Sequence, residues 1–241
     1  MGLDDLAWTS AERALHAARE ADAPDVEIAI SMRYLAWTLV RQQRFAEAER
    51  IAVAAAERIQ PNMLDQDPQR AGVFGNLLFN AATAALSTGN VARADDLLAE
   101  AQAAATRART DHATEAAIFG PRVAALQRID HTARAGEAEL ALQQAKTAPA
   151  PTGDVPAFWE AGHRLRLAAA SAQARQDRDA LAYLKAARDL APDWVRYQPL
   201  GTATRRRLVD RAPRRLGDAF SDLAIHYGVL PRESQSHTAT P

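Results

Sequence analysis

The stretch from Ser31 to Pro61 constrains the fold of this chain more than any other. In its first half, apolar side chains recur with the i, i+3, i+4, i+7 spacing of an amphipathic helix: Met32, Leu35, Ala36 and Leu39. A narrower stripe of small residues follows: Ala48, Ala52 and Ala55. Pro61 closes this second pattern, because proline cannot continue a helix. We therefore predict a hairpin of two short helices whose alanines allow a close approach.

One such hairpin cannot bury its own apolar faces, so further copies must stack against it. The pattern recurs, and it predicts hairpins over about 25–61, 69–109, 113–147 and 156–192, a terminal helical pair over 193–229 and a disordered tail over 230–241. Alanine, leucine, arginine and glutamate dominate the composition and aromatic residues make up only 6% of it, which favours helix almost everywhere. We predict an all-α fold.

The pattern does not decide how the helices are arranged in two segments. Leu3–Ala21 has apolar residues at helical spacing and looks like the second helix of a hairpin whose first helix is missing; the residues expected to face inward are Leu3, Leu6, Ala7, Ala14 and Ala18. Pro121 either begins the first helix of the third hairpin or kinks a longer helix that starts near Ala113.

The charge balance argues against a nucleic-acid or membrane partner. The chain has 29 Lys+Arg against 30 Asp+Glu, so it carries no overall basic field. The arginines between Arg205 and Arg215 are interpreted as a solvated face or an intermolecular contact, because no aromatic residues are interleaved with them. No apolar run approaches the roughly 18 residues of a membrane span, and the acidic N-terminus does not resemble a secretory signal. We expect a soluble, cytoplasmic protein.

No residue pattern typical of an enzyme is present. The chain has no cysteine, so disulfides, thiolate metal sites and a cysteine nucleophile are excluded. Its six histidines lack the i, i+4 partner of a helical zinc site, and Gly72–Gly75 matches neither phosphate-binding fingerprint. We expect no catalytic residues, no metal site and no cofactor, and hence a protein that is not an enzyme.

Candidate binding residues lie on the first helix of each predicted hairpin, outside its apolar core. The resemblance of these hairpins to known helical-repeat arrays, described below, implies that their first helices line a concave groove. The polar and aromatic positions expected to point into it are Arg33, Tyr34, Trp37, Arg41, Asn76, Phe79, Asn80, Thr83, Gln127, Asp130, Arg134, Arg166 and Gln173. Asparagine amides can pair with an extended peptide, and arginines can hold a carboxylate. The alternative is that these are ordinary solvated positions, with Trp37 and Phe79 packed between hairpins.

The bulky and small positions of the hairpins, with their closing proline, resemble the tetratricopeptide repeat, which implies a right-handed superhelical array. Over residues 3–229, successive blocks also resemble the C-terminal sensor region of actinobacterial helix-turn-helix transcriptional regulators: DLAWTSAERALHAA, YLAWTLVRQQRFAEAERIA, FGPRVAALQRI, AGEAELAL, VRYQPLGTATRRRL and GDAFSDLAIHYGV. The DNA-reading domain of that family is missing, so we expect either a stand-alone sensor-like protein or a fragment or diverged copy of a regulator. Arg122, Val123 and Gln127 replace a Thr–Asn pair and a histidine usual in the family, which implies that any ligand differs or is absent.

These patterns together predict a non-catalytic module that binds a peptide or protein partner or a small-molecule effector. The alternative is a scaffold, homodimeric or docked to a partner, that uses its alanine-rich faces and its last helical pair. Direct regulation of DNA comes third, because it requires a fused domain or a partner that supplies one.

Overall fold

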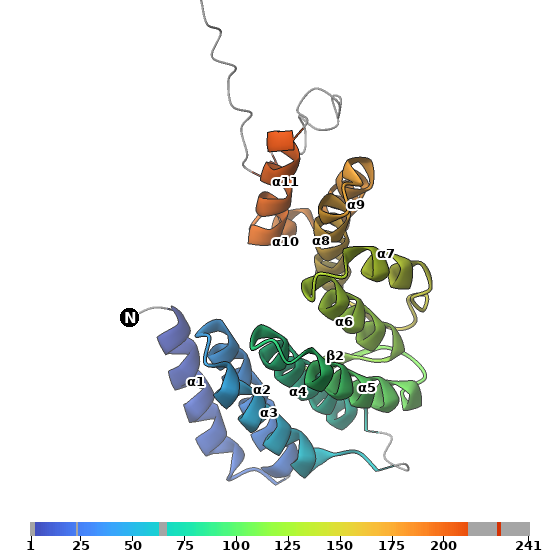
Figure 1. The fold of residues 1–241 in the computed structure, drawn as a ribbon. Coiled ribbons are helices and arrows are strands. Elements are labelled where there is room, and N and C mark those ends of the chain that lie inside the picture. Colours follow the sequence, from blue (N-terminus) through green and yellow to red (C-terminus); the bar gives the residue numbers. More distant parts are fainter. Residues whose placement is uncertain (1–2, 23, 63–66, 212–225, 228–241) are drawn as a thin grey trace, which may run out of the picture. The chain divides into compact units, whose positions relative to one another are not determined.

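The computed structural model describes residues 3–22, 24–62, 67–211 and 226–227, with the side chains of residues 3, 4, 210 and 211 left out. These residues form eleven helices and two two-residue strands (Figure 1). The helices are α1 (Leu3–Ala18), α2 (Pro24–Arg41), α3 (Phe45–Ile59), α4 (Pro68–Ser87), α5 (Val91–Arg107), α6 (Pro121–Arg134), α7 (Ala138–Lys146), α8 (Ala157–Gln173), α9 (Asp177–Leu190), α10 (Pro192–Val195) and α11 (Pro199–Arg211). The predicted all-α fold is confirmed, whereas the superhelical winding stays a prediction.

The chain divides into two compact units. The first comprises Met1–Glu137 and Gln143–Val155, and the second comprises Ala138–Leu142 and Pro156–Pro241. The division falls within α7, whose last residues, Gln143 onward, belong to the first unit.

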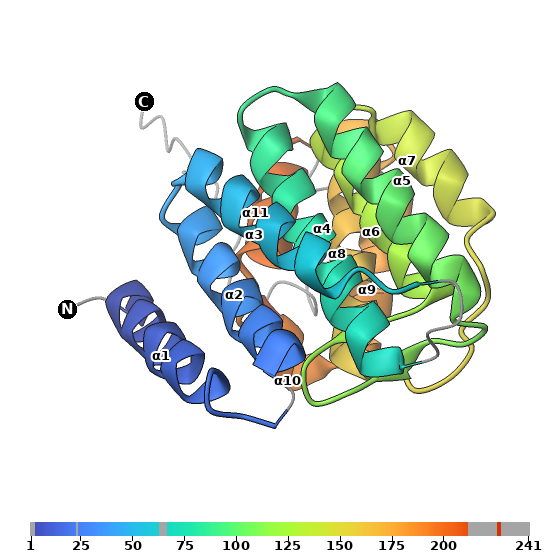
Figure 2. The ribbon, with the colours of Figure 1, turned by 90° about the horizontal axis from the view of Figure 1, so that it is seen from below.

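Helices that follow one another in sequence pack against one another in the first unit. Contacts join α1 to α2, α2 to α3, α3 to α4 and α4 to α5, and α2 also touches α4 (Figure 2). The predicted small stripe of Ala48, Ala52 and Ala55 is buried at these crossings. Because alanine lets two helix axes approach closely, a chain poor in large apolar residues still forms a dense core.

The inward face predicted for α1 is confirmed only at Ala18, which is buried, and the side chain of Leu3 lies outside the described part of the chain. Leu6, Ala7 and Ala14 are exposed, and Leu6 retains 52% of its accessible surface. The residues that turn inward with Ala18 are Trp8, Ala11 and Leu15, of which Ala11 is buried. These four positions also follow helical spacing, and they give α2 a larger apolar surface than the predicted stripe, because they include a tryptophan.

A small antiparallel hairpin precedes α6 and resolves the alternatives for Pro121. Strand β1 (His112–Ala113) pairs with β2 (Ile118–Phe119), so the longer helix from Ala113 is wrong and Pro121 begins α6. Strand β2 contacts both α4 and α6. A Cβ at Gly75 would overlap the Phe119 ring, and one at Gly72 would lie 2.9 Å from the Ala117 Cβ. The two glycines of α4 therefore allow the hairpin to lie against this helix.

The core of the second unit forms between α8 and α9. Ala180, Leu184 and Ala187 of α9 are fully buried. Helix α11 packs on α8, and the Tyr227 hydroxyl donates a hydrogen bond to the Leu184 carbonyl at 3.1 Å. Of the terminal pair predicted over 193–229, only α10, α11 and residues 226–227 fall within the described residues, and the predicted tail over 230–241 lies outside them.

Arg205 departs from the predicted solvated basic face. Its side chain is fully buried in the second unit, whereas Arg206 and Arg207 are exposed. Burial lowers the pKa of the Arg205 guanidinium. The arginines beyond Arg211 lie outside the part of the chain that the structure describes.

Candidate functional site

The candidate residues of α2 form a group of aromatic and basic side chains in which Arg33 is partly buried and the other three are exposed. Tyr34 and Trp37, one helical turn apart, are 48% and 45% exposed, and Arg41 is also exposed on the following turn. The Arg33 guanidinium lies 4.1 Å from the centre of the Tyr34 ring, and burial lowers its pKa. We call Arg33, Tyr34 and Trp37 the α2 aromatic patch.

The asparagines of α4 are used inside the protein rather than offered to a ligand. Asn80 is buried and donates a hydrogen bond to the Arg33 carbonyl at 3.2 Å, which ties α4 to α2. Asn76 donates to the carbonyls of Gly72 at 2.9 Å and Ile118 at 3.3 Å. The expectation that Asn80 points into an open groove is therefore wrong, because a buried amide requires a partner and finds it in the neighbouring helix.

The candidates on α6 are largely covered as well. Gln127 and Asp130 are buried, so their predicted exposure to a groove is wrong. Arg134 lies 4.0 Å from an Asp130 carboxylate oxygen and donates to the hydroxyl of the buried Thr83 at 3.4 Å. These contacts join α6 to α4 and serve the packing of the first unit.

The remaining candidates do not extend the patch. Phe79 is partly buried on α4, in keeping with the alternative that it packs between hairpins. Arg166 and Gln173 lie on α8 in the second unit; Arg166 is partly buried and Gln173 is exposed. Trp37, in contrast to Phe79, is not packed between hairpins, since nearly half of its surface is accessible.

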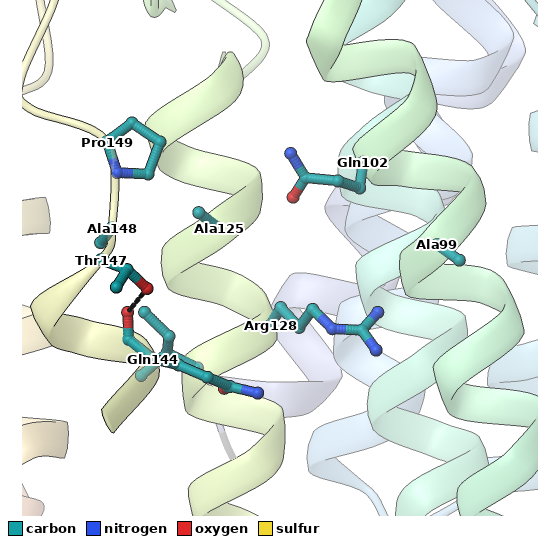
Figure 3. Close-up of a pocket in the computed structure, with 9 residues that line it drawn as sticks. Ala99, Gln102, Ala125, Arg128, Gln144, Thr147, Ala148 and Pro149 are labelled. Carbon is teal, nitrogen blue, oxygen red and sulfur yellow. Dashed lines mark hydrogen bonds between the residues drawn. The ribbon is translucent and has the colours of Figure 1, made fainter. Parts of the chain in front are cut away.

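Sequence reasoning missed a groove of about 520 Å³ in the first unit, bounded by α5, α6 and the end of α7 (Figure 3). We call it the α5–α7 groove. It is lined by Ala99, Gln102, Ala125, Arg128, Ile129, Gln144, Thr147, Ala148 and Pro149. These residues come from three elements separated by up to fifty positions, so no local pattern could have indicated that they meet.

The charged side chains beside this groove are only loosely paired. Arg128 Nη2 lies 3.9 Å from Asp95 Oδ1, and His131 Nε2 lies 3.7 Å from the same oxygen. Burial lowers the pKa of His131 below its ordinary 6.5, an effect that the nearby Asp95 carboxylate partly opposes. His131 is therefore mainly neutral at neutral pH, and Arg128 is the cation that faces the groove.

The rim of the groove is held by a buried carboxylate and a buried arginine. Asp111 accepts hydrogen bonds from the Val123 N–H at 3.0 Å, in the first turn of α6, and from the Thr152 hydroxyl at 3.4 Å. Arg122 donates to the Pro149 carbonyl. Gly120 and Gly153 have positive φ angles, and a Cβ at either would collide with Asp111. These contacts join the loop that follows α7, which includes Pro149 of the groove lining, to the start of α6.

A second groove of about 440 Å³ lies between α3 and α5, and we call it the α3–α5 groove. It is lined by Ala46, Glu49, Arg50, Val53, Ala54, Glu57 and Arg93. Arg93 Nε donates to Glu49 Oε1 at 3.3 Å, so the cation is paired within the groove.

Within the described ranges, no helix has both the length and the apolar character needed to cross a membrane. Over the same residues, no group of three or more histidine, aspartate or glutamate side chains is placed to hold a metal ion.

No family model, curated protein or solved structure matches this chain. The resemblance to regulator sensor regions therefore stays a prediction. The described residues define an all-α protein of packed helical hairpins with an exposed aromatic patch and surface grooves that include the α5–α7 and α3–α5 grooves.

Proposed function

We propose that the protein is a non-catalytic binding module that recognises a peptide or protein partner through the α2 aromatic patch. The supporting observation is the exposure of Tyr34 and Trp37, one turn apart on the same helix, beside Arg33. Tryptophan, tyrosine and arginine are the residues most enriched among those that carry the binding energy of protein interfaces. Large aromatic side chains left in water are costly, so a partner that covers them gains affinity.

The finer parts of this proposal come from the sequence. A tetratricopeptide-like array, a cytoplasmic location and a role like that of the sensor region of a transcriptional regulator are consistent with stacked helical hairpins. Because Asn80 and Gln127 are buried, the proposed contact rests on aromatic packing and one arginine rather than on a row of asparagines.

A random peptide library selected on the immobilised protein tests the proposal. Peptides enriched over a bare support are labelled, and their dissociation constants are measured by fluorescence anisotropy. Trp37→Ala should weaken binding at least tenfold, or about 1.4 kcal/mol. The matched control is Tyr197→Ala, which removes a 77% exposed aromatic ring in the second unit and should change the dissociation constant less than about twofold. Equal affinity for wild type and Trp37→Ala would remove the proposal.

A homo-oligomeric scaffold is the second candidate, and the outer face of α1 favours it. Leu6, Ala7 and Ala14 share that exposed face, and a helix of a second copy could cover them. Sedimentation velocity over a range of concentrations tests this alternative. A dimer that Leu6→Glu dissociates would support the scaffold, and a monomer at every concentration would reject it.

A further inference from the structure

The α5–α7 groove has the size and lining of a small-molecule site. Its volume of about 520 Å³ falls within the range of about 300–1,000 Å³ typical of ligand pockets. Ala125 and Ile129 of α6 contribute apolar surface between the α5 and α7 sides, while the small side chains of Ala99 and Ala148 leave the space open. The rim is held by Asp111 and Arg122, so a ligand would not have to order it.

Arg128 supplies a positive charge with unused hydrogen-bonding capacity. Its side chain is 41% exposed, and the 3.9 Å separation from Asp95 is longer than a hydrogen bond. A guanidinium carries five N–H donors in a planar fork that matches a carboxylate. Figure 3 shows Arg128 and Gln144 extending toward α5, and Gln102 extending from α5 toward α6 on the side of Ala125.

Gln144 supplies an acceptor that has no donor. Its Oε1 atom is buried, and no described residue donates a hydrogen bond to it. A buried carbonyl without a partner is costly, so a ligand N–H placed here would recover that energy. The groove therefore offers a carboxylate-binding cation, a buried acceptor and an apolar surface within one cavity.

We propose that the α5–α7 groove binds a carboxylate that also carries an amide N–H and a short apolar group. The carboxylate pairs with Arg128, the amide N–H donates to Gln144 Oε1, and the apolar group lies on Ala125 and Ile129. This is the chemistry of an N-acylated amino acid, and equally of the last residue of a peptide. The site lies on other helices than the α2 aromatic patch and does not depend on the proposed function.

The α3–α5 groove provides the internal control. Arg93 has the same 41% exposure as Arg128, but its Nε is hydrogen-bonded to Glu49. A second carboxylate, Glu57, also lines that groove, and its lining includes no buried acceptor without a partner. A carboxylate ligand would there have to compete with Glu49 for Arg93, and the other arginine of that groove, Arg50, is exposed and has no buried acceptor beside it among the described residues.

N-acetyl-leucine is the probe, and its binding to the full chain is measured by ligand-observed NMR and calorimetry. The ligand concentration extends to about 10 mM, because so small a ligand is expected to bind in the millimolar range. Arg128→Gln should weaken binding at least tenfold, and N-acetyl-leucinamide, which lacks the carboxylate, should bind wild type equally poorly. Gln144→Leu should weaken binding severalfold. Ala99→Phe, which fills the groove without touching its polar groups, should abolish binding.

Three controls make the result specific. Arg93→Gln removes an arginine of equal exposure and should leave the dissociation constant within twofold of wild type, as should Trp37→Ala in the α2 aromatic patch. Circular dichroism verifies that each variant is folded. No saturable binding by wild type, or equal binding by wild type and Arg128→Gln, would overturn the proposal.

A last pair of probes identifies the source of the ligand. An N-acetylated tripeptide that ends in leucine with a free carboxylate is compared with N-acetyl-leucine. Tighter binding of the tripeptide supports recognition of a peptide C-terminus. Weaker binding, with N-acetyl-leucine still dependent on Arg128, supports a free acylated amino acid.

Discussion

The two grooves of the first unit differ less in size than in what their own side chains leave unpaired. In the α3–α5 groove, the Arg93 guanidinium already donates a hydrogen bond to the Glu49 carboxylate. In the α5–α7 groove the nearest carboxylate to Arg128 stands 3.9 Å away, and Gln144 Oε1 has no donor among the described residues. The comparison teaches that stacked hairpins can form more than one groove. A few side chains then decide whether the polar groups of a groove are paired with one another or remain available to a ligand.

The β-hairpin packs against α6, which forms one side of the α5–α7 groove. Helix α6 contacts α4 and α5 directly, and strand β2 contacts both α4 and α6. The chain between α5 and α6 therefore contributes to the position of α6, and the Asp111 and Arg122 contacts then hold the loop that follows α7. Four changes, ordered from the largest expected effect to the smallest, test this comparison.

Gly75→Ala should be the most damaging substitution. The new methyl group would overlap the buried Phe119 ring, and we expect the free energy of unfolding to fall by about 3 kcal/mol in urea denaturation. Gly72→Ala is the matched control on the same helix, with its nearest neighbour at 2.9 Å and an expected loss of about 1 kcal/mol. Equal stability of the two variants would show that β2 does not pack against α4 as described.

Asp111→Ala should loosen the rim of the α5–α7 groove and leave the α3–α5 groove intact. Loss of a buried acceptor that holds the Val123 N–H should cost about 2 kcal/mol, measured by thermal and urea unfolding. Hydrogen exchange at the Val123 amide should accelerate as well. Asp67, which caps α4 from an exposed position through the Gln69 N–H, is the control, and Asp67→Ala should cost about 1 kcal/mol.

The stability of the first unit should decrease as the pH falls below 6.5. Burial lowers the folded-state pKa of His131; the carboxylates of Asp95 and Asp130 oppose this, and the guanidinium groups of Arg134 and Arg128 add to it. The unfolded chain therefore binds a proton more readily than the folded one. The stabilisation is complete above pH 6.5 and is lost as the pH falls toward the lowered pKa.

His131→Gln is the variant that tests this pH dependence, by urea denaturation at a series of pH values from 5 to 7. We expect a shallower slope of stability against pH than in wild type. His226, whose pKa is also lowered chiefly by burial, keeps part of the slope, and His226→Gln is the control in the second unit. An unchanged slope in His131→Gln would contradict the assignment.

Glu49→Gln should have the smallest effect, because an exposed ion pair contributes little. We expect a loss of about 0.5 kcal/mol or less, and a double-mutant cycle with Arg93→Gln should give a coupling of similar size. The variant leaves Arg93 without a carboxylate partner, yet it should not create binding of N-acetyl-leucine, because the α3–α5 groove has no counterpart of Gln144. Binding there would show that an unpaired arginine is sufficient.

The exposure of the candidate residues could be predicted for α2 but not for α4 and α6. Tyr34 and Trp37 lie outside the apolar stripe of α2, and that face is accessible in the structure. Asn80 and Gln127 lie outside the apolar stripes of their own helices too, yet both are buried. Helical periodicity tells which face of a helix is apolar, and it cannot tell whether another element covers the polar face.

The sequence by itself determined the all-helical class and the end of α3 before Pro61, because these depend on local spacing, on alanine-rich composition and on proline. It did not determine which face of α1 is buried or that β2 packs against Gly75. It also did not determine that Ala99, Arg128 and Gln144 line the same groove. Only the tertiary structure decided these, because each depends on contacts between residues far apart in the chain, and local periodicity carries no information about such contacts.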